Sequence, residues 1–173
     1  EIVNPIIEVR QSFQKFINFI QKVSTPISII KDNKEMTFVN EKISNQGVVF
    51  TDNENTVVFW EDVSHDMFYD LLEKSGFVEQ YPLECAGLAR LDEQIDLSAK
   101  YLAMAWNKTQ QGYERMKISD LYAKMKGIPT PLKGFIVVNG KFLTLEEKEQ
   151  LDKEELARLE EEKKRHAEEM LRK

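Results

Sequence analysis

The sequence predicts an α+β protein: an N-terminal helix with a four-stranded antiparallel meander and a following helix, then helices, a β-hairpin and a long charged C-terminal helix. Three observations support this class. Apolar residues recur at helical spacing near the start, four short β-type runs follow, and an uninterrupted charged helical pattern closes the chain. We expect three parts: residues 1–80 as an α+β unit, residues 81–143 as a helical region packed on it and ending in the hairpin, and residues 144–173 as a projecting charged helix.

The first predicted helix covers residues 5–23. Asn4 can cap it, and Pro5 falls in the first turn, where a helix tolerates proline. Its apolar residues recur at spacings of three and four and therefore share one face: Ile6, Val9, Phe13, Phe16, Ile17 and Ile20. Thr25-Pro26 should end the helix, because the residue before a proline disfavours the helical region. We expect the apolar face to pack across the sheet.

Four β-type runs follow this helix as two successive hairpins. The runs PISII and EMTFV flank the connector KDNK, and GVVFT and TVVFW flank the connector DNEN. Both connectors are rich in Asp and Asn, which tolerate tight-turn geometry. Ser64 is then a predicted N-cap for the next helix, and Gly76 is its predicted stop.

The second half of the chain reads as mostly helical. Residues 78–94 are less regular and are expected to connect two halves, whereas residues 92–111 and then 118–126 carry helical patterns. Asn139-Gly140 between apolar runs is the strongest hairpin signal in the chain, since both residues of such a turn must accept positive φ.

The closing segment, residues 144–173, predicts one long helix. Thr144 and Glu147 form a capping box. Acid-first pairs four residues apart are frequent, and each contributes roughly 0.2–0.5 kcal/mol, so the helix needs little tertiary support. Alternate steps of three and four residues from Leu145 trace the positions that would face a partner helix, and only about half of them are apolar. This pattern does not favour a homodimeric coiled coil. Two readings of this helix stay open: a solvated helix that only projects from the domain, or an arm that docks on a protein partner through Leu156, Arg158, Leu159, Met170 and Leu171.

Composition narrows the classes of function. The net charge is −6 and the isoelectric point about 5.1, a balance that disfavours binding to phosphate backbones. Cys85 is the only cysteine, so no intramolecular disulfide forms, and we expect an intracellular, reducing compartment. No apolar run approaches the roughly 20 residues of a membrane span. The chain starts at Glu1, so the sequence makes no prediction about a targeting segment.

No motif predicts a catalytic, cofactor-binding or metal-ligating residue. The stretch WEDVSHD gathers Glu61, Asp62, His65 and Asp66, but it falls at a strand-to-helix junction, where acidic residues and a serine cap are ordinary. Cys85 has no signature of a nucleophile, and it reads as a buried thiol. A calcium loop starting at Asp52 would need Gly and Glu where the chain has Val57 and Val63.

The stretch 100–133 offers a different reading, because basic and aromatic residues alternate there. Single-stranded nucleic acid binds to such a combination. The candidate residues are Lys100, Tyr101, Trp106, Lys108, Tyr113 and Arg115. The competing explanation is that the rings are core and the lysines form the solvated face of the same helices.

These observations favour a non-catalytic protein-interaction protein: an accessory subunit, adaptor or inhibitor that docks on a larger partner partly through its C-terminal helix. One alternative is a factor associated with single-stranded nucleic acid through residues 100–133. A second is a small α+β enzyme whose active-site residues are scattered along the sequence.

Overall fold

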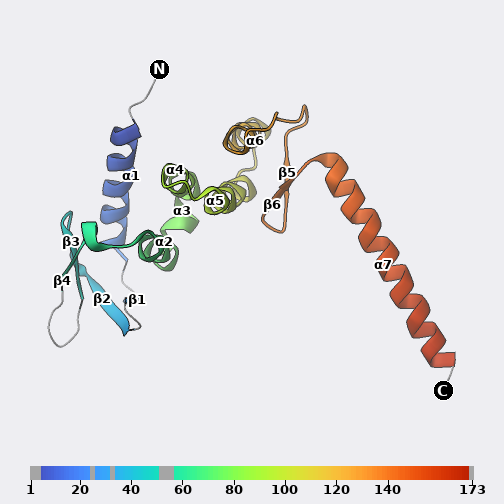
Figure 1. The fold of residues 1–173 in the computed structure, drawn as a ribbon, viewed down its shortest axis with the longest axis horizontal. Helices are drawn as coiled ribbons and strands as arrows, with labels where there is room; N and C mark the ends of the chain where they lie inside the picture. Colours follow the sequence, from blue (N-terminus) through green and yellow to red (C-terminus); the bar gives the residue numbers. More distant parts are fainter. Residues whose placement is uncertain (1–4, 24–25, 32–33, 51–56, 172–173) are drawn as a thin grey trace. The chain divides into compact units, whose positions relative to one another are not determined.

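The computed structural model describes residues 5–23, 26–31, 34–50 and 57–171, and it divides into two compact units, Glu1–Tyr101 and Leu102–Lys173. The two units meet within the sequence of helix α5 (Ile95–Lys108), and the three-part division expected from the sequence, at residues 80 and 143, stays a prediction. Most described residues are helical, two small sheets are present, and the α+β class is confirmed (Figure 1).

The first unit begins with a helix and a small sheet and continues with further helices. Its elements before α5 are α1 (Pro5–Ile20), β1 (Ile27–Lys31), β2 (Lys34–Ile43), β3 (Gly47–Phe50), β4 (Val57–Phe59), a 3₁₀ turn (Trp60–Asp62), α2 (His65–Lys74), α3 (Phe77–Gln80) and α4 (Pro82–Leu91). The predicted cap at Asn4, the stop at Thr25, the connector DNEN and the rejected calcium-loop start at Asp52 lie outside the described residues.

The four strands form one antiparallel sheet in the order β1-β2-β3-β4, and the four-stranded meander expected from the sequence is corrected in its pairing, which is irregular between β2 and β3. Strand β2 is ten residues long and β4 only three, and the pairing of β2 with β3 shifts register between Phe38 and Ile43. Gly47 explains the close approach of β3 to β4, since a Cβ atom there would lie 2.4 Å from the Val58 carbonyl oxygen. The register shift between β2 and β3 bends β2, the strand that carries the extra residues.

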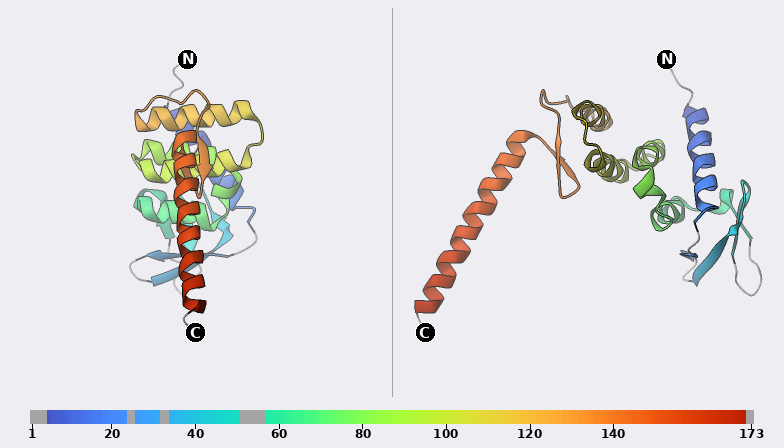
Figure 2. Two further views of the ribbon diagram at one scale, coloured as in Figure 1. Left: turned by 90° about the vertical axis from the view of Figure 1, so that its right-hand side faces the viewer. Right: turned by 180° about the vertical axis from the view of Figure 1, so that it is seen from behind.

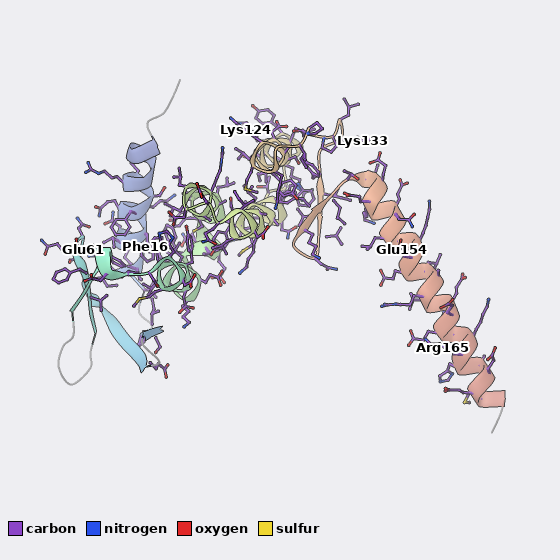
Figure 3. The ribbon with its side chains drawn as sticks, viewed as in Figure 1. Phe16, Glu61, Lys124, Lys133, Glu154 and Arg165 are labelled. Atoms are coloured by element: carbon purple, nitrogen blue, oxygen red, sulfur yellow. The ribbon has the colours of Figure 1, made fainter. Side chains whose placement is uncertain are left out.

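The core of the first unit is built around Phe16 of α1, which is fully buried and labelled in Figure 3. Its ring makes edge-on contacts with Trp60, Phe68 and Phe77, with centroids 6.1, 5.6 and 5.3 Å away. Such pairs add about 0.5–1.5 kcal/mol beyond area burial. Helix α1 therefore packs on α3 and α4 as well as on β2, and α2 lies against β1, so the sheet is not covered by α1 alone.

Two corrections concern the middle of the chain. Residues 78–94 are not an irregular connector, because most of them form α3 and α4, with Pro82 in the first turn of α4. Helix α6 runs over Gly112–Lys126 and thus starts six residues before the predicted one. The predictions for α2 are confirmed: Ser64 Oγ accepts a hydrogen bond from the Met67 amide at 3.3 Å, and Gly76 follows the helix with a φ of 78°.

The second unit contains α6, a hairpin and the closing helix. The predicted turn is confirmed: β5 (Ile136–Val138) pairs with β6 (Lys141–Leu143), and Asn139 and Gly140 have φ values of 51° and 75°. The hairpin packs on α6 through rings, with Phe142 stacked on Tyr122 at a centroid distance of 4.2 Å. Phe135 completes this cluster against both rings.

Helix α7 (Leu145–Leu171) is a single unbroken helix of 27 residues (Figure 2). The predicted capping box is confirmed: the Thr144 amide donates to Glu147 Oε2 at 2.7 Å, and the Glu147 amide donates to Thr144 Oγ1 at 3.1 Å. Every described side chain from Leu145 to Met170 is exposed, except that Lys148 is half-buried.

Candidate functional site

The strongest candidate for a functional surface is an apolar stripe along α7. Leu156 is 61% exposed, Leu159 43% and Met170 65%, and Leu145 at the start of the helix is also exposed. The spacing from Leu145 to Leu156, and again from Leu159 to Met170, is eleven residues, which is about three turns of a straight α-helix. These four side chains therefore lie on one face, which we call the α7 stripe.

The α7 stripe contains most, but not all, of the residues that the sequence predicted for docking. Arg158 lies toward the other side of the helix, because it falls between the turns that carry the stripe. Leu171 lies in α7, but its side chain is not among those described. The expected docking residues left out Leu145, which the eleven-residue spacing indicates. Glu154 and Arg165, labelled in Figure 3, are also eleven residues apart and form part of the opposite, charged face.

The α7 stripe has acidic flanks over its central part. Segment 149–163 contains seven acidic and three basic residues, and the acids three or four residues from Leu156 or Leu159 are Asp152, Glu155, Glu160 and Glu162. Asp152 also forms an ion pair with Lys148 one turn before it. A protein surface that covers this segment needs apolar contacts at its centre and basic groups at its rim.

The candidate residues for nucleic acid do not form one stacking surface. Tyr101 is fully buried, and its hydroxyl donates to Glu73 at 3.1 Å, while Lys100 pairs with the same carboxylate at 2.7 Å. The guanidinium of Arg115 covers one face of the Trp106 ring at 4.2 Å. Of the described candidate rings, only Tyr113 is largely exposed, at 72%.

Arg115 has a second role in the fold, and Lys108 stays at the surface. Arg115 also donates from Nε to the Thr109 carbonyl oxygen at 2.7 Å, so it ties α6 to the turn before it. Lys108 is exposed in the last turn of α5, where a cation complements the helix dipole. A base can thus stack on Tyr113 alone among the six candidates.

The cluster in WEDVSHD is an ordinary helix start. Glu61 and Asp62 lie in the 3₁₀ turn, and His65 and Asp66 occupy the exposed first turn of α2 after its serine cap. Across the described parts of the chain, no group of three or more His, Cys, Asp or Glu side chains is arranged to hold a metal ion.

Cys85 is fully buried in α4. Burial, followed by the negative charge of Glu84, raises the pKa of its thiol to about 12. The thiol is therefore protonated near neutral pH, whereas a cysteine nucleophile needs a lowered pKa.

Two open grooves flank α1 in the first unit and meet at Lys15, with volumes of about 660 and 760 Å³. The Lys15 ammonium pairs with Glu84 and lies 3.8 Å from the centroid of the Tyr81 ring. Neither groove has a histidine or a cysteine among the described residues that line it. These residues therefore supply neither an imidazole nor a thiol for catalysis.

A membrane span has no candidate among the described helices, because none is both long and apolar enough to cross a bilayer. Comparison with known proteins found no match for this chain among protein-family models, curated proteins or solved structures.

Proposed function

We propose that this chain is a non-catalytic interaction protein, an accessory subunit, adaptor or inhibitor, that docks on a larger protein through α7. The observation that carries the proposal is the α7 stripe, four apolar side chains that share one face of an exposed helix. At 1.5 Å per residue the helix is about 40 Å long, which suits a helix laid into a groove.

Stability of the chain's own fold does not account for this stripe. Single exposed apolar side chains are common on protein surfaces, but apolar side chains that recur on one helix face normally mark the face that becomes buried. Acidic flanks add selectivity, because they repel acidic surfaces and attract a basic rim.

The runner-up function, binding of single-stranded nucleic acid, has weaker support. Its two central rings are engaged inside the protein, Tyr101 with Glu73 and Trp106 with Arg115. Exposed Tyr113, with the Lys117 ammonium 4.4 Å from its ring centroid, is the one feature that favours it.

Site-specific photo-crosslinking in the full chain tests the docking proposal. A photoreactive residue is placed at Leu159, on the α7 stripe, or at Ala157, on another face, and lysate is irradiated with and without nuclease. We expect a protein adduct of defined mass from position 159 that is indifferent to nuclease and much weaker from position 157.

A pair of charge-matched variants provides the control. Because these variants change positions 157 and 159, the photoreactive residue is placed at Leu145, which is also on the α7 stripe. Leu156→Asp with Leu159→Asp should abolish the adduct from position 145. Gln150→Asp with Ala157→Asp adds two acids off the stripe and should preserve that adduct. Equal crosslinking by both variants would refute the docking proposal, and an adduct that nuclease removes would favour the nucleic-acid alternative.

A further inference from the structure

Helix α7 carries an ordered pattern of charge on the same face as the α7 stripe. The positions that would face a partner helix follow alternate steps of four and three residues from Leu145, and every one of them is exposed. In chain order they are Leu145, Glu149, Asp152, Leu156, Leu159, Lys163, His166 and Met170. We call these eight residues the α7 seam, which consists of the α7 stripe and the four polar residues between its members.

The α7 seam reads as its own complement when the helix is turned end for end. Its midpoint falls between Ala157 and Arg158, with one leucine on each side. Two acids precede these leucines, a lysine and a histidine follow them at the same distances, and an apolar residue closes each end. An antiparallel second copy therefore matches every position of the seam. The resulting pairs are Leu145 with Met170, Glu149 with His166, Asp152 with Lys163, and Leu156 with Leu159.

We propose that α7 pairs with α7 of a second copy of this chain in antiparallel orientation, with Asp152 of each copy beside Lys163 of the other. This inference rests on the proposed role of the α7 stripe as a docking surface. It adds that a second copy of the chain covers that surface through an isologous, twofold contact, so that self-association competes with docking on the larger protein.

The polar positions of the seam determine the orientation. In a parallel pair each residue would face its own counterpart, so Glu149, Asp152 and Lys163 would each meet a like charge, which destabilises a helix pair. In the antiparallel pair Asp152 meets Lys163, and the Glu149 carboxylate meets the His166 imidazole, whose N–H can donate to it. The apolar share of one half thus limits the affinity of the pair, whereas the charges select the antiparallel arrangement.

The register follows from the same residues. Sliding one antiparallel helix by a heptad would place Asp152 against Leu156 in one direction and against Met170 in the other. Either shift removes the contact of Leu156 with Leu159 and leaves the Asp152 carboxylate facing an apolar side chain, which is costly. Only the register centred between Ala157 and Arg158 keeps both the leucine contacts and the charge pairs.

Charges beside the seam also favour this pairing. Lys153 of one copy falls near Glu160 of the other, and Lys148 falls near Glu169. Lys148 also pairs with Asp152 within its own helix, so the ionic contacts continue from one copy to the next. One like-charged pair, Glu155 with Glu162, opposes these contacts. The flanks are therefore complementary on balance.

Sedimentation equilibrium of the purified full chain tests the pairing. We expect a dimer with a dissociation constant between about 10 μM and 1 mM, because half of the seam is polar. Asp152→Lys and Lys163→Glu each introduce two like-charged contacts, and each should raise the dissociation constant about tenfold. An equimolar mixture of the two variants should regain the affinity of the unchanged chain, because each changed position then meets the opposite charge.

Two matched controls make the same changes of charge on the opposite face of α7. Glu154→Lys and Arg165→Glu, at the positions labelled in Figure 3, should leave the dissociation constant within about twofold. Circular dichroism verifies that each variant keeps its helix. Controls that weaken the dimer as much as the seam variants would overturn the inference, as would a mixture no tighter than either variant alone. The absence of a dimer at about 1 mM would also overturn it.

A photoreactive residue at Leu145 reports the orientation in the purified chain. We expect an adduct of twice the chain mass, with the crosslink in the peptide of the second copy that contains Met170. A crosslink to the peptide that contains Leu145 would show a parallel pair and overturn the proposal.

The two proposals fail in different ways, because the purified chain reports on self-association and lysate reports on a larger partner. A chain that stays monomeric when pure but gives an adduct of another mass in lysate would remove only the self-association. An adduct of doubled mass as the sole product in lysate would remove only the larger partner.

Discussion

Replacing both Leu156 and Leu159 with alanine should leave the stability of the folded chain almost unchanged. The two side chains are 61% and 43% exposed, so their truncation removes little buried apolar area. Alanine is also at least as good a helix former as leucine. We therefore expect a change in the free energy of unfolding within about 0.5 kcal/mol per site, as is usual for surface positions.

Ile118 provides the contrast within the same unit. It is only 3% exposed, and replacing a buried isoleucine by alanine costs about 2–5 kcal/mol, since contacts are lost and a cavity remains. The ratio between the two effects measures how far the α7 stripe takes part in the fold of its own chain.

Urea denaturation followed by tryptophan fluorescence measures both changes. Trp60 belongs to the first unit, so a Trp60→Phe background restricts the signal to Trp106 in the second unit. A loss of more than about 1.5 kcal/mol in the double alanine variant would show that Leu156 and Leu159 pack on their own protein. Such a result would refute the reasoning that assigns them to a partner.

Three further predictions concern the framework around these surfaces. Ser119→Ala should destabilise the second unit by about 1–3 kcal/mol, because the Phe135 amide loses its buried acceptor, and urea denaturation that shows less than 0.5 kcal/mol would contradict this. Gly140→Ala should cost roughly 1–2 kcal/mol through its positive φ, whereas Lys141→Ala in the adjoining strand serves as a near-neutral control in thermal melts. Cys85 should react with a thiol reagent at the rate of opening of the first unit, and should be modified quickly only in denaturant. Burial raises the pKa of the Cys85 thiol from 9.0 to about 12, so between pH 9 and 12 the thiol ionises in the unfolded chain and not in the folded one. The free energy of unfolding should therefore fall as the pH rises through this range. A Cys85→Ala variant with the same decline would disprove this contribution.

Local signals in the sequence predicted the ends of elements well. The cap at Ser64, the turn at Asn139-Gly140 and the capping box at Thr144 all depend on a few neighbouring residues, and the structure has each of them. Such motifs are determined by backbone geometry that the side chain itself satisfies, so they need no knowledge of the rest of the fold.

Helix α4 could not be predicted in the same way. Small apolar residues, including Cys85, Ala86 and Ala89, are buried beside exposed Leu83, so the boundary between a polar and an apolar face is weak in the sequence. The start of α6 was missed for a related reason, because Gly112 is a poor helix former and the polar residues after it carry little periodicity.

The candidate site shows a further limit, which concerns the direction of side chains. Tyr101 and Tyr113 look alike in the sequence, as rings among lysines, yet one is fully buried and the other is 72% exposed. Tertiary packing distinguishes them, and the contact of Tyr101 with Glu73 joins residues 28 positions apart. Leu156, Leu159 and Met170 of the α7 stripe were easier to predict, since helical spacing alone groups them on one face.

The stack of Phe142 on Tyr122 also determines how this molecule would carry a mechanical load. Helix α7 starts two residues after β6 ends, so a partner that pulls on α7 pulls directly on that strand. Strand β6 is held by its three-residue pairing with β5 and by the rings against α6. Under tension, the hairpin is thus the element expected to yield first, at a force set by a few hydrogen bonds and one aromatic cluster, while α6 stays folded.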